Sequence, residues 1–204
     1  MDFQRNLQLL EFVETGSTSK VRNWLLDDPN LDVNWKSGAS EPTYLQIACR
    51  KGHLDIVELL LRHPAIELNQ ESENCTAFYW ACYEGQETCV RRLLKDLRVT
   101  LSNQNRTPIR MAAFFGHIPV IKWMIASGRD LDQVPLAIKV AREKFNQKET
   151  QSSLENRQDN CTVVAQLLTR YQREEDLVRR EIREELGITG NDKVQIFPIA
   201  IREK

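Results

Sequence analysis

The sequence has few of the residues on which several classes of functional site depend. Only 8 of its 204 residues are glycine, and neither a GxGxxG nor a P-loop pattern occurs, which argues against a phosphate-holding loop. Its 5 cysteines are scattered without a CxxC pair, which predicts reduced thiols in an intracellular protein, cytoplasmic or nuclear. The net charge is only -1, so no general attraction to nucleic acid or to an anionic membrane is expected.

Long apolar runs and a secretory signal are also missing. No apolar stretch approaches the ~20 residues that a membrane helix needs. The opening residues MDFQRN are not a basic region followed by an apolar one. With 41% hydrophobic and 28% charged residues, the chain can nevertheless bury a core. We therefore expect a folded protein with no cofactor, no nucleic-acid partner and no membrane partner.

Three segments of the chain repeat at intervals close to 33 residues. Each begins with a threonine, continues through a short apolar stretch to a glycine, and then carries a second apolar stretch. The three glycines are Gly52, Gly85 and Gly116, which lie 33 and 31 residues apart. Apolar residues three and four positions apart indicate two short helices in each segment, and the glycine is expected to end the first.

These segments resemble the ankyrin repeat. Residues 107–117 read TPIRMAAFFGH, close to the signature Thr-Pro-Leu-His-x-Ala with its Gly-His step, and residues 56–60 read IVELL. Helices this short are not stable alone, so the pairs are expected to stack side by side. The resemblance covers residues 7–170. It implies an all-α ankyrin-repeat solenoid of four to five repeats with a C-terminal capping helix.

The domain boundaries follow from the same pattern. The array is predicted to occupy residues 1–170, and the capping helix with an apolar tail residues 171–204. A polar stretch near 147–160 is expected to be an exposed insertion between the helices of the last repeat. The apolar, β-prone segment 194–201 must either pack on the array or bind another chain.

The histidines and cysteines favour structural roles over a metal site. Cys82 and Cys89 lie seven residues apart in one predicted helix pair, but His53 and His117 lie in different repeats, whereas zinc needs four ligands close together. In the family, the histidine after the glycine ties neighbouring turns together, which is the role expected for His53 and His117. Cys75 lies in a loop and is expected to be exposed, and Trp80 takes a position that the repeat motif fills with a core residue.

A second motif lies in the predicted capping helix. Residues 180–188, REIREELGI, match the second half of the Nudix box, whose glutamates hold divalent metal against a diphosphate. The earlier Gly and Glu positions of that box hold Gln166 and Gln172, and few residues follow it to build a mixed sheet. The favoured interpretation is a solvated capping helix, with a degenerate Nudix-like hydrolase as the alternative.

The resemblance implies a non-enzymatic module that binds another protein through its concave face, as a monomer. In ankyrin arrays, partner contacts concentrate on the tips of the finger loops and on first-helix residues just before the glycine. A further alternative is the targeting part of a larger regulatory protein, such as a ubiquitin-ligase adaptor or kinase. Carried over by position, the candidate partner-binding residues are Trp35, Lys36, Arg50, Lys51, Glu71, Glu73, Tyr83, Glu84, Gln104, Arg106, Phe114 and Phe115.

Overall fold

The computed structural model describes residues 2–28, 31–102, 107–146 and 155–188. Within these ranges the chain forms eleven helices and no strand. They are α1 (Asp2–Glu14), α2 (Thr18–Asp27), α3 (Tyr44–Lys51), α4 (Leu54–Leu61), α5 (Ala77–Tyr83), α6 (Glu87–Leu94), α7 (Pro108–Phe114), α8 (Ile118–Ser127), α9 (Val134–Asn146), α10 (Glu155–Arg173) and α11 (Glu175–Glu185).

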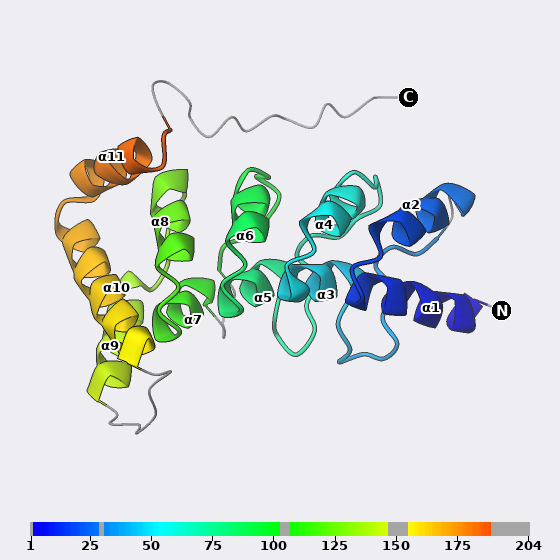
Figure 1. Cartoon of the computed structure of the whole chain (residues 1–204), viewed down its shortest axis with the longest axis horizontal. Helices are drawn as coiled ribbons and strands as arrows, with labels where there is room; N and C mark the ends of the chain where they lie inside the picture. The colour runs from blue at the N-terminus through cyan, green and yellow to red at the C-terminus, as the bar shows by residue number, and fades with distance from the viewer. Residues whose placement is uncertain (1, 29–30, 103–106, 147–154, 189–204) are drawn as a thin grey trace.

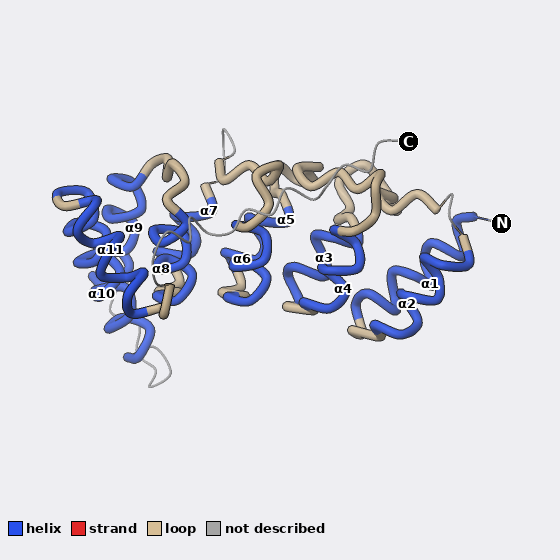
Figure 2. The backbone as a smooth tube through the Cα atoms, turned by 90° about the horizontal axis from the view of Figure 1, so that it is seen from above, coloured by secondary structure: helices blue, strands red, loops and turns tan. Residues whose placement is uncertain are grey.

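The first ten helices form five consecutive pairs that stack side by side (Figure 1). Helices α2, α4, α6 and α8 make one row, and α1, α3, α5 and α7 make a second row, called here the first-helix row. The loops that join one pair to the next gather along one side of the array (Figure 2). The all-α solenoid predicted from the sequence is therefore confirmed.

Local hydrogen bonds at the ends of α3 and α5 explain where these helices begin and end. The Thr43 hydroxyl accepts a bond from the Gln46 N–H at 3.2 Å, and the Gln46 side chain accepts one from the Thr43 N–H at 2.9 Å. This capping box satisfies two donors that the helix itself leaves unpaired. Thr76 accepts the same bond from the Tyr79 N–H at 3.2 Å. Gly52 follows α3 with a φ of 77°, a conformation that costs glycine little.

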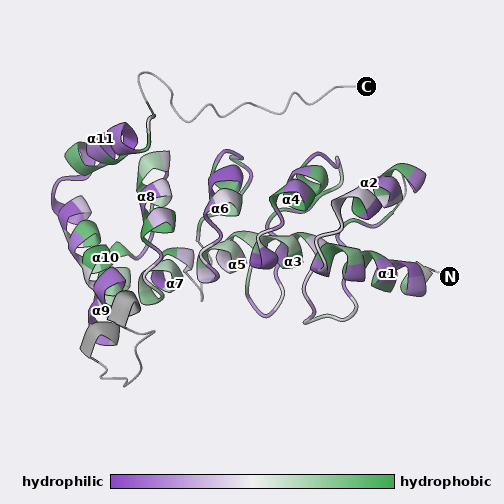
Figure 3. Ribbon diagram, in the orientation of Figure 1, coloured by the Kyte–Doolittle hydropathy of each residue, from purple (hydrophilic) through white to green (hydrophobic). Residues whose placement is uncertain are grey.

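One continuous hydrophobic core runs along the array between the two rows of helices. Ala48, Ala81 and Ala112 take the same place in α3, α5 and α7, and all three are fully buried. Their small side chains let neighbouring first helices approach closely. In Figure 3, α11 combines hydrophobic (green) and hydrophilic (purple) residues, as a covering helix should. None of the described helices is both long and apolar enough to cross a membrane.

Side chains that follow the helix-ending glycines connect each repeat to the one before it. His53 Nε2 donates a hydrogen bond to the Glu14 carbonyl at 3.2 Å, and His117 Nε2 donates one to the Tyr83 carbonyl at 3.0 Å. Gln86 takes the same place in the repeat between them. The predicted role of the two histidines is thus confirmed.

Asparagines make a second set of connections, between neighbouring finger loops. Asn34 Nδ2 donates to the Ala65 carbonyl at 2.7 Å, and its Oδ1 accepts from the Glu67 N–H at 2.8 Å. Asn69 makes the same two kinds of bond to the loop that follows its own. Because one amide bridges two backbone groups, each asparagine fixes the spacing between successive loops.

The finger loop before α5 corrects one expectation. Ser72 and Cys75 exchange two backbone hydrogen bonds, of 3.1 and 2.9 Å, around Glu73 and Asn74. Both central residues have positive φ, 51° and 60°, as in the tight turns that join hairpins. The turn places Glu73 at the tip and folds Cys75 back beneath it. Cys75 is therefore buried, and the prediction that it is exposed was wrong.

The C-terminal region differs from the predicted boundaries. Helix α10 begins at Glu155, so residues 155–160 form its first turns and are not part of an insertion. The rest of that predicted insertion, 147–154, and the apolar segment 194–201 lie outside the described residues. Helix α11 packs on α8 and α10 and buries Val178 and Ile182, as expected of a capping helix.

Two arginines of α11 bind the carbonyl end of α8. Arg183 Nε donates to the Ala126 carbonyl at 2.8 Å, and Arg179 Nε donates to the Ile125 carbonyl at 3.4 Å. Carbonyls in the last turn of a helix have no partner within it. We expect Arg183→Met to lower the free energy of unfolding by about 1 kcal/mol, measured by urea denaturation. The exposed Arg180→Met is the control, and an equal loss in both variants would contradict this role.

Candidate functional site

Aromatic side chains from two neighbouring repeats form a continuous cluster on the first-helix row. Trp80 and Tyr83 of α5 meet edge to face, with ring centroids 5.5 Å apart. Tyr83 contacts Phe115 at 4.7 Å, and Phe115 contacts Phe114 at 4.9 Å. All four side chains are only partly buried. They are called here the aromatic cluster.

The register of the repeats explains why these rings meet. Trp80 and Tyr83 of α5 correspond to Met111 and Phe114 of α7, each 31 residues later. Residues three apart on a helix lie on one face, and stacked repeats bring the same face of successive helices together. Phe115 comes directly after Phe114, at the end of α7. Side chains far apart in the sequence therefore share one surface.

The surface beside the aromatic cluster is hollowed into an open groove of about 380 Å³. Helices α5, α7 and α9 supply its walls. Helix α9 comes this near because only residues 128–133 join it to α8, whereas residues 62–76 join α4 to α5. The groove, called here the aromatic groove, is lined by Tyr83, Arg110, Met111, Phe114, Phe115, Val140 and Glu143.

The aromatic cluster extends toward α3 through a cation–π contact. The Arg50 guanidinium lies over the Trp80 ring, 5.5 Å from its centroid. Trp80 was predicted to be a core residue, and that prediction was wrong, because its side chain is only half-buried. Ala77, Ala81 and Cys82 occupy the buried face of α5. Trp80 is consequently left on the surface of the first-helix row.

The structure brings together part of the predicted set of partner-binding residues. Tyr83, Phe114 and Phe115 line the same groove. Lys51, the last residue of α3, and Glu84, just after α5, are both exposed. Lys51 follows Arg50 and Glu84 follows Tyr83 in the sequence, and the two side chains carry opposite charges.

The predicted finger residues Trp35 and Lys36 make internal contacts. Trp35 stacks on Tyr44 with centroids 5.9 Å apart and meets Phe3 edge to face at 5.6 Å. Lys36 Nζ donates a hydrogen bond to the Glu71 carbonyl at 3.2 Å. Both residues thus help hold the N-terminal end of the array together.

The remaining predicted finger residues are Glu71, Glu73, Gln104 and Arg106. Glu71 and Glu73 are exposed on the loop between α4 and α5. Gln104 and Arg106 lie outside the described residues. Neither Glu71 nor Glu73 lines the aromatic groove.

Sequence reasoning missed five residues of this surface: Trp80, Arg110, Met111, Val140 and Glu143. Aligning the repeats could have found three of them. Trp80 and Met111 occupy equivalent positions in successive repeats, each three residues before a predicted contact residue, Tyr83 or Phe114. Arg110 lies next to Met111 and takes the position of the signature histidine. Val140 and Glu143 carry no such signal, because their approach depends on the short loop before α9.

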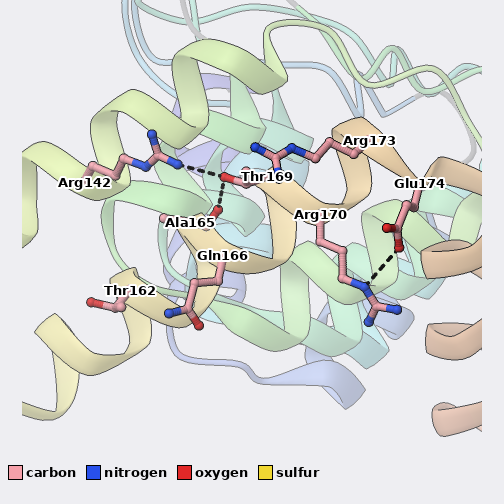
Figure 4. Close-up of a pocket in the computed structure, with 8 residues that line it drawn as sticks. All are labelled: Arg142, Thr162, Ala165, Gln166, Thr169, Arg170, Arg173 and Glu174. Carbon is pink, nitrogen blue, oxygen red and sulfur yellow. Dashed lines mark hydrogen bonds and ion pairs between the residues drawn. The ribbon is translucent and has the colours of Figure 1, made fainter.

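A second hollow, of about 600 Å³, lies between α9 and α10 and has a different character (Figure 4). Arg142 donates a hydrogen bond to the Thr169 hydroxyl at 3.1 Å, and Arg170 pairs with Glu174 at 3.4 Å. Its lining is mainly polar and includes no aromatic side chain. Since two of its arginines already have internal partners, the aromatic groove is the better candidate for a protein contact.

The buried thiols beneath this surface are poorly suited to nucleophilic chemistry. Burial raises the pKa of Cys49 and Cys82 well above the ordinary value, and that of Cys89 to about 11. Because the thiolate is the reactive form, these groups stay neutral near pH 7. Among the described residues there is also no cluster of three His, Cys, Asp or Glu side chains able to hold a metal.

The glutamates of the Nudix-like segment connect helices to one another. Glu181 forms an ion pair with Arg170 of α10 at 2.7 Å, and Glu185 forms one with Lys122 of α8. A Nudix box needs a surrounding sheet, and the described part of the chain has no strand. The motif therefore has a structural explanation in the packing of α11.

Comparison with known proteins agrees with this architecture. The family model for ankyrin repeats (3 copies) matches residues 9–102 and 45–134. The chain is 24% identical over 135 residues to transient receptor potential cation channel subfamily A member 1 of Homo sapiens, covering 61% of this chain and 12% of that protein. The homolog of that channel subunit in Caenorhabditis elegans is 28% identical over 121 residues, 59% of this chain and 10% of that protein.

A third relative has a different domain composition. It is the ankyrin repeat and KH domain-containing protein mask-1 of Caenorhabditis elegans, 30% identical over 92 residues. The match covers 44% of this chain and 4% of that protein. The chain thus spans about an eighth or less of the length of these curated relatives.

Ankyrin repeats are protein–protein interaction modules and are generally not enzymes. The residues matched by the family model begin in α1 and end at the start of α9, so they include the aromatic cluster. That match covers more than half of the chain, and the stacked helix pairs agree with it. This chain therefore belongs to the ankyrin repeat family.

Proposed function

We propose that this chain, as a monomer, binds another protein through its concave face, formed by the first-helix row, with the aromatic groove at the centre. The supporting observation is the series of partly exposed rings from Trp80 to Phe115 beside an open groove of about 380 Å³. Aromatic side chains are enriched among the residues that contribute most to protein binding. Membership of a family of interaction modules supports the same function.

Rigidity is the main contribution of the fold to this binding. Tyr83 lies between Trp80 and Phe115, and its carbonyl accepts the hydrogen bond from His117. Side chains already held in place lose little entropy when a partner binds. Arg50, with its guanidinium over the Trp80 ring, adds a positive charge at one edge and favours approach of an acidic surface.

Substitution of Tyr83 tests the proposed surface. The full chain would capture partners from an extract of its source cells, and the partner, once purified, would be titrated by calorimetry. We expect Tyr83→Ala to weaken binding about 30-fold, because truncating a hot-spot aromatic costs about 2 kcal/mol. Melting temperatures of both proteins, measured by circular dichroism, separate a binding effect from unfolding.

Leu26→Ala is the matched control for this experiment. Leu26 is a large apolar residue of α2, 72% exposed, in the other row of helices. Its truncation removes apolar surface without touching the first-helix row, so the Kd should not change. Equal losses in the two variants, or no loss in either, would place the binding surface elsewhere.

A second proposal concerns the setting of the array: that it is the targeting part of a larger regulatory protein. The relatives support this, since the chain spans 12% or less of each. Sequencing full-length transcripts tests it directly. We expect a reading frame that extends before Met1 or after Lys204; a stop codon directly after Lys204 with no coding sequence before Met1 would exclude it.

A further inference from the structure

Arg110, one of the residues that line the aromatic groove, carries a donor without a hydrogen-bond acceptor. Its side chain is half-buried on α7, and its Nε atom is buried with no hydrogen-bond acceptor. Arg110 also forms no ion pair with any residue that the structure describes. Glu143, which lines the same groove, instead forms an ion pair with Lys139, with 3.7 Å between Glu143 Oε1 and Lys139 Nζ.

The repeat register explains why this donor is left without a partner. Gln46 takes the same position in α3, and its Nε2 donates to the carbonyls of Gln70 and Cys75 at 2.7 and 2.9 Å. Those carbonyls belong to the finger loop that follows. After α8 only residues 128–133 precede α9, so no comparable loop reaches Arg110. The short loop that opens the groove is thus the same feature that leaves Arg110 unpaired.

A carboxylate is the natural complement of such a group. A buried N–H without an acceptor is unfavourable, and a guanidinium offers a planar pair of donors that fits a carboxylate. Charge-assisted hydrogen bonds of this kind are also stronger than neutral ones. The other groove residues are mainly apolar, with Met111, Phe114 and Val140 beside Arg110. The site therefore combines one cationic donor with an apolar wall.

We propose that the aromatic groove binds a partner segment in which an apolar side chain lies next to an Asp or Glu, with that carboxylate on Arg110. This inference rests on the proposed function and specifies its partner chemistry. The groove is open and adjoins the aromatic cluster, which extends as far as Arg50 on α3. A segment that continues along the first-helix row suits this surface, so the carboxylate is that of an internal side chain.

The probe is a phage-displayed library of short random peptides selected on the full chain. Synthetic versions of the selected peptides, with amidated C-termini, would be titrated by fluorescence anisotropy. We expect them to share an apolar residue beside an acidic one. Replacing that Glu by Gln should weaken binding to the wild type about tenfold, and binding to Arg110→Met by no more than about twofold.

Two further variants make the outcome specific. Arg110→Lys keeps the charge but not the planar pair of donors, so it should retain only part of the preference for Glu over Gln. Arg110→Met should melt no lower than the wild type, because Arg110 Nε makes no hydrogen bond in the free protein. A clear loss of stability in Arg110→Met would overturn the inference by showing that Arg110 has a structural partner.

The experiment distinguishes failure of this inference from failure of the proposed function. If Tyr83→Ala abolishes peptide binding but Glu and Gln peptides bind equally, only the carboxylate contact is rejected. If binding requires a free peptide C-terminus, the assignment of the carboxylate to an internal Asp or Glu side chain is rejected. If the library gives no peptide whose binding depends on Tyr83, both proposals fail.

Discussion

Replacing Gly85 with alanine is expected to lower the free energy of unfolding by about 2 to 4 kcal/mol. Gly85 has a φ of 70°, and a Cβ atom there would lie 2.6 Å from His117 Nδ1. The substitution therefore adds backbone strain and displaces the ring that donates to the Tyr83 carbonyl. Urea denaturation followed by circular dichroism measures the loss.

Gly187→Ala separates these two causes. Gly187 has nearly the same φ, 69°, but no described atom lies within 4 Å of the position that an added methyl group would take. Only the backbone strain remains, so we expect a loss of about 1 kcal/mol. If both variants lose the same stability, the contact between Gly85 and His117 contributes nothing to the stacking of repeats.

Truncation of Leu93 to alanine is expected to cost about 2 to 5 kcal/mol, because the cavity it leaves cannot close fully. Leu93 lies on α6 in the middle of the array and is 1% exposed. In a stacked array each repeat is stabilised only by its neighbours, so a weakened central repeat also weakens those on both sides. Denaturation midpoints of the full chain measure the effect.

Leu97→Ala provides the matched comparison in the same repeat. This substitution removes the same atoms from the loop just after α6, where the Leu97 side chain is 60% exposed. The truncation should change stability by no more than about 0.5 kcal/mol. Similar losses for the two leucines would mean that burial along the row formed by α2, α4, α6 and α8 does not hold the array together.

Much of the fold could be predicted because its signals are local. A threonine that caps a helix and a glycine that ends it act within a few residues, so Thr43, Thr76 and Gly52 identify helix ends directly. The interval between repeats then predicts which helices are neighbours. For the same reason, the contacts of His53 and His117 with the preceding repeat could be expected from their positions after glycines.

The sequence predicted only part of the aromatic cluster and groove, because short helices give weak information about which face is buried. Helix α5 is seven residues long and carries Phe78, Tyr79 and Trp80 in succession. Because seven residues make fewer than two turns of helix, the sequence pattern does not show which of these rings faces the core. In the structure Phe78 is buried and Trp80 is on the surface, so the cluster gained a residue that the sequence had assigned to the interior.

The sequence by itself determined the repeat, the helix pairs and the order in which they stack, since hydrogen bonds and apolar periodicity within one repeat are enough to specify them. Tertiary structure alone decided the aromatic groove and the unpaired donor of Arg110. Both depend on how near α9 comes to α7, and that distance is set by packing between repeats. A short loop permits the approach, but only the assembled helices show which side chains it brings together.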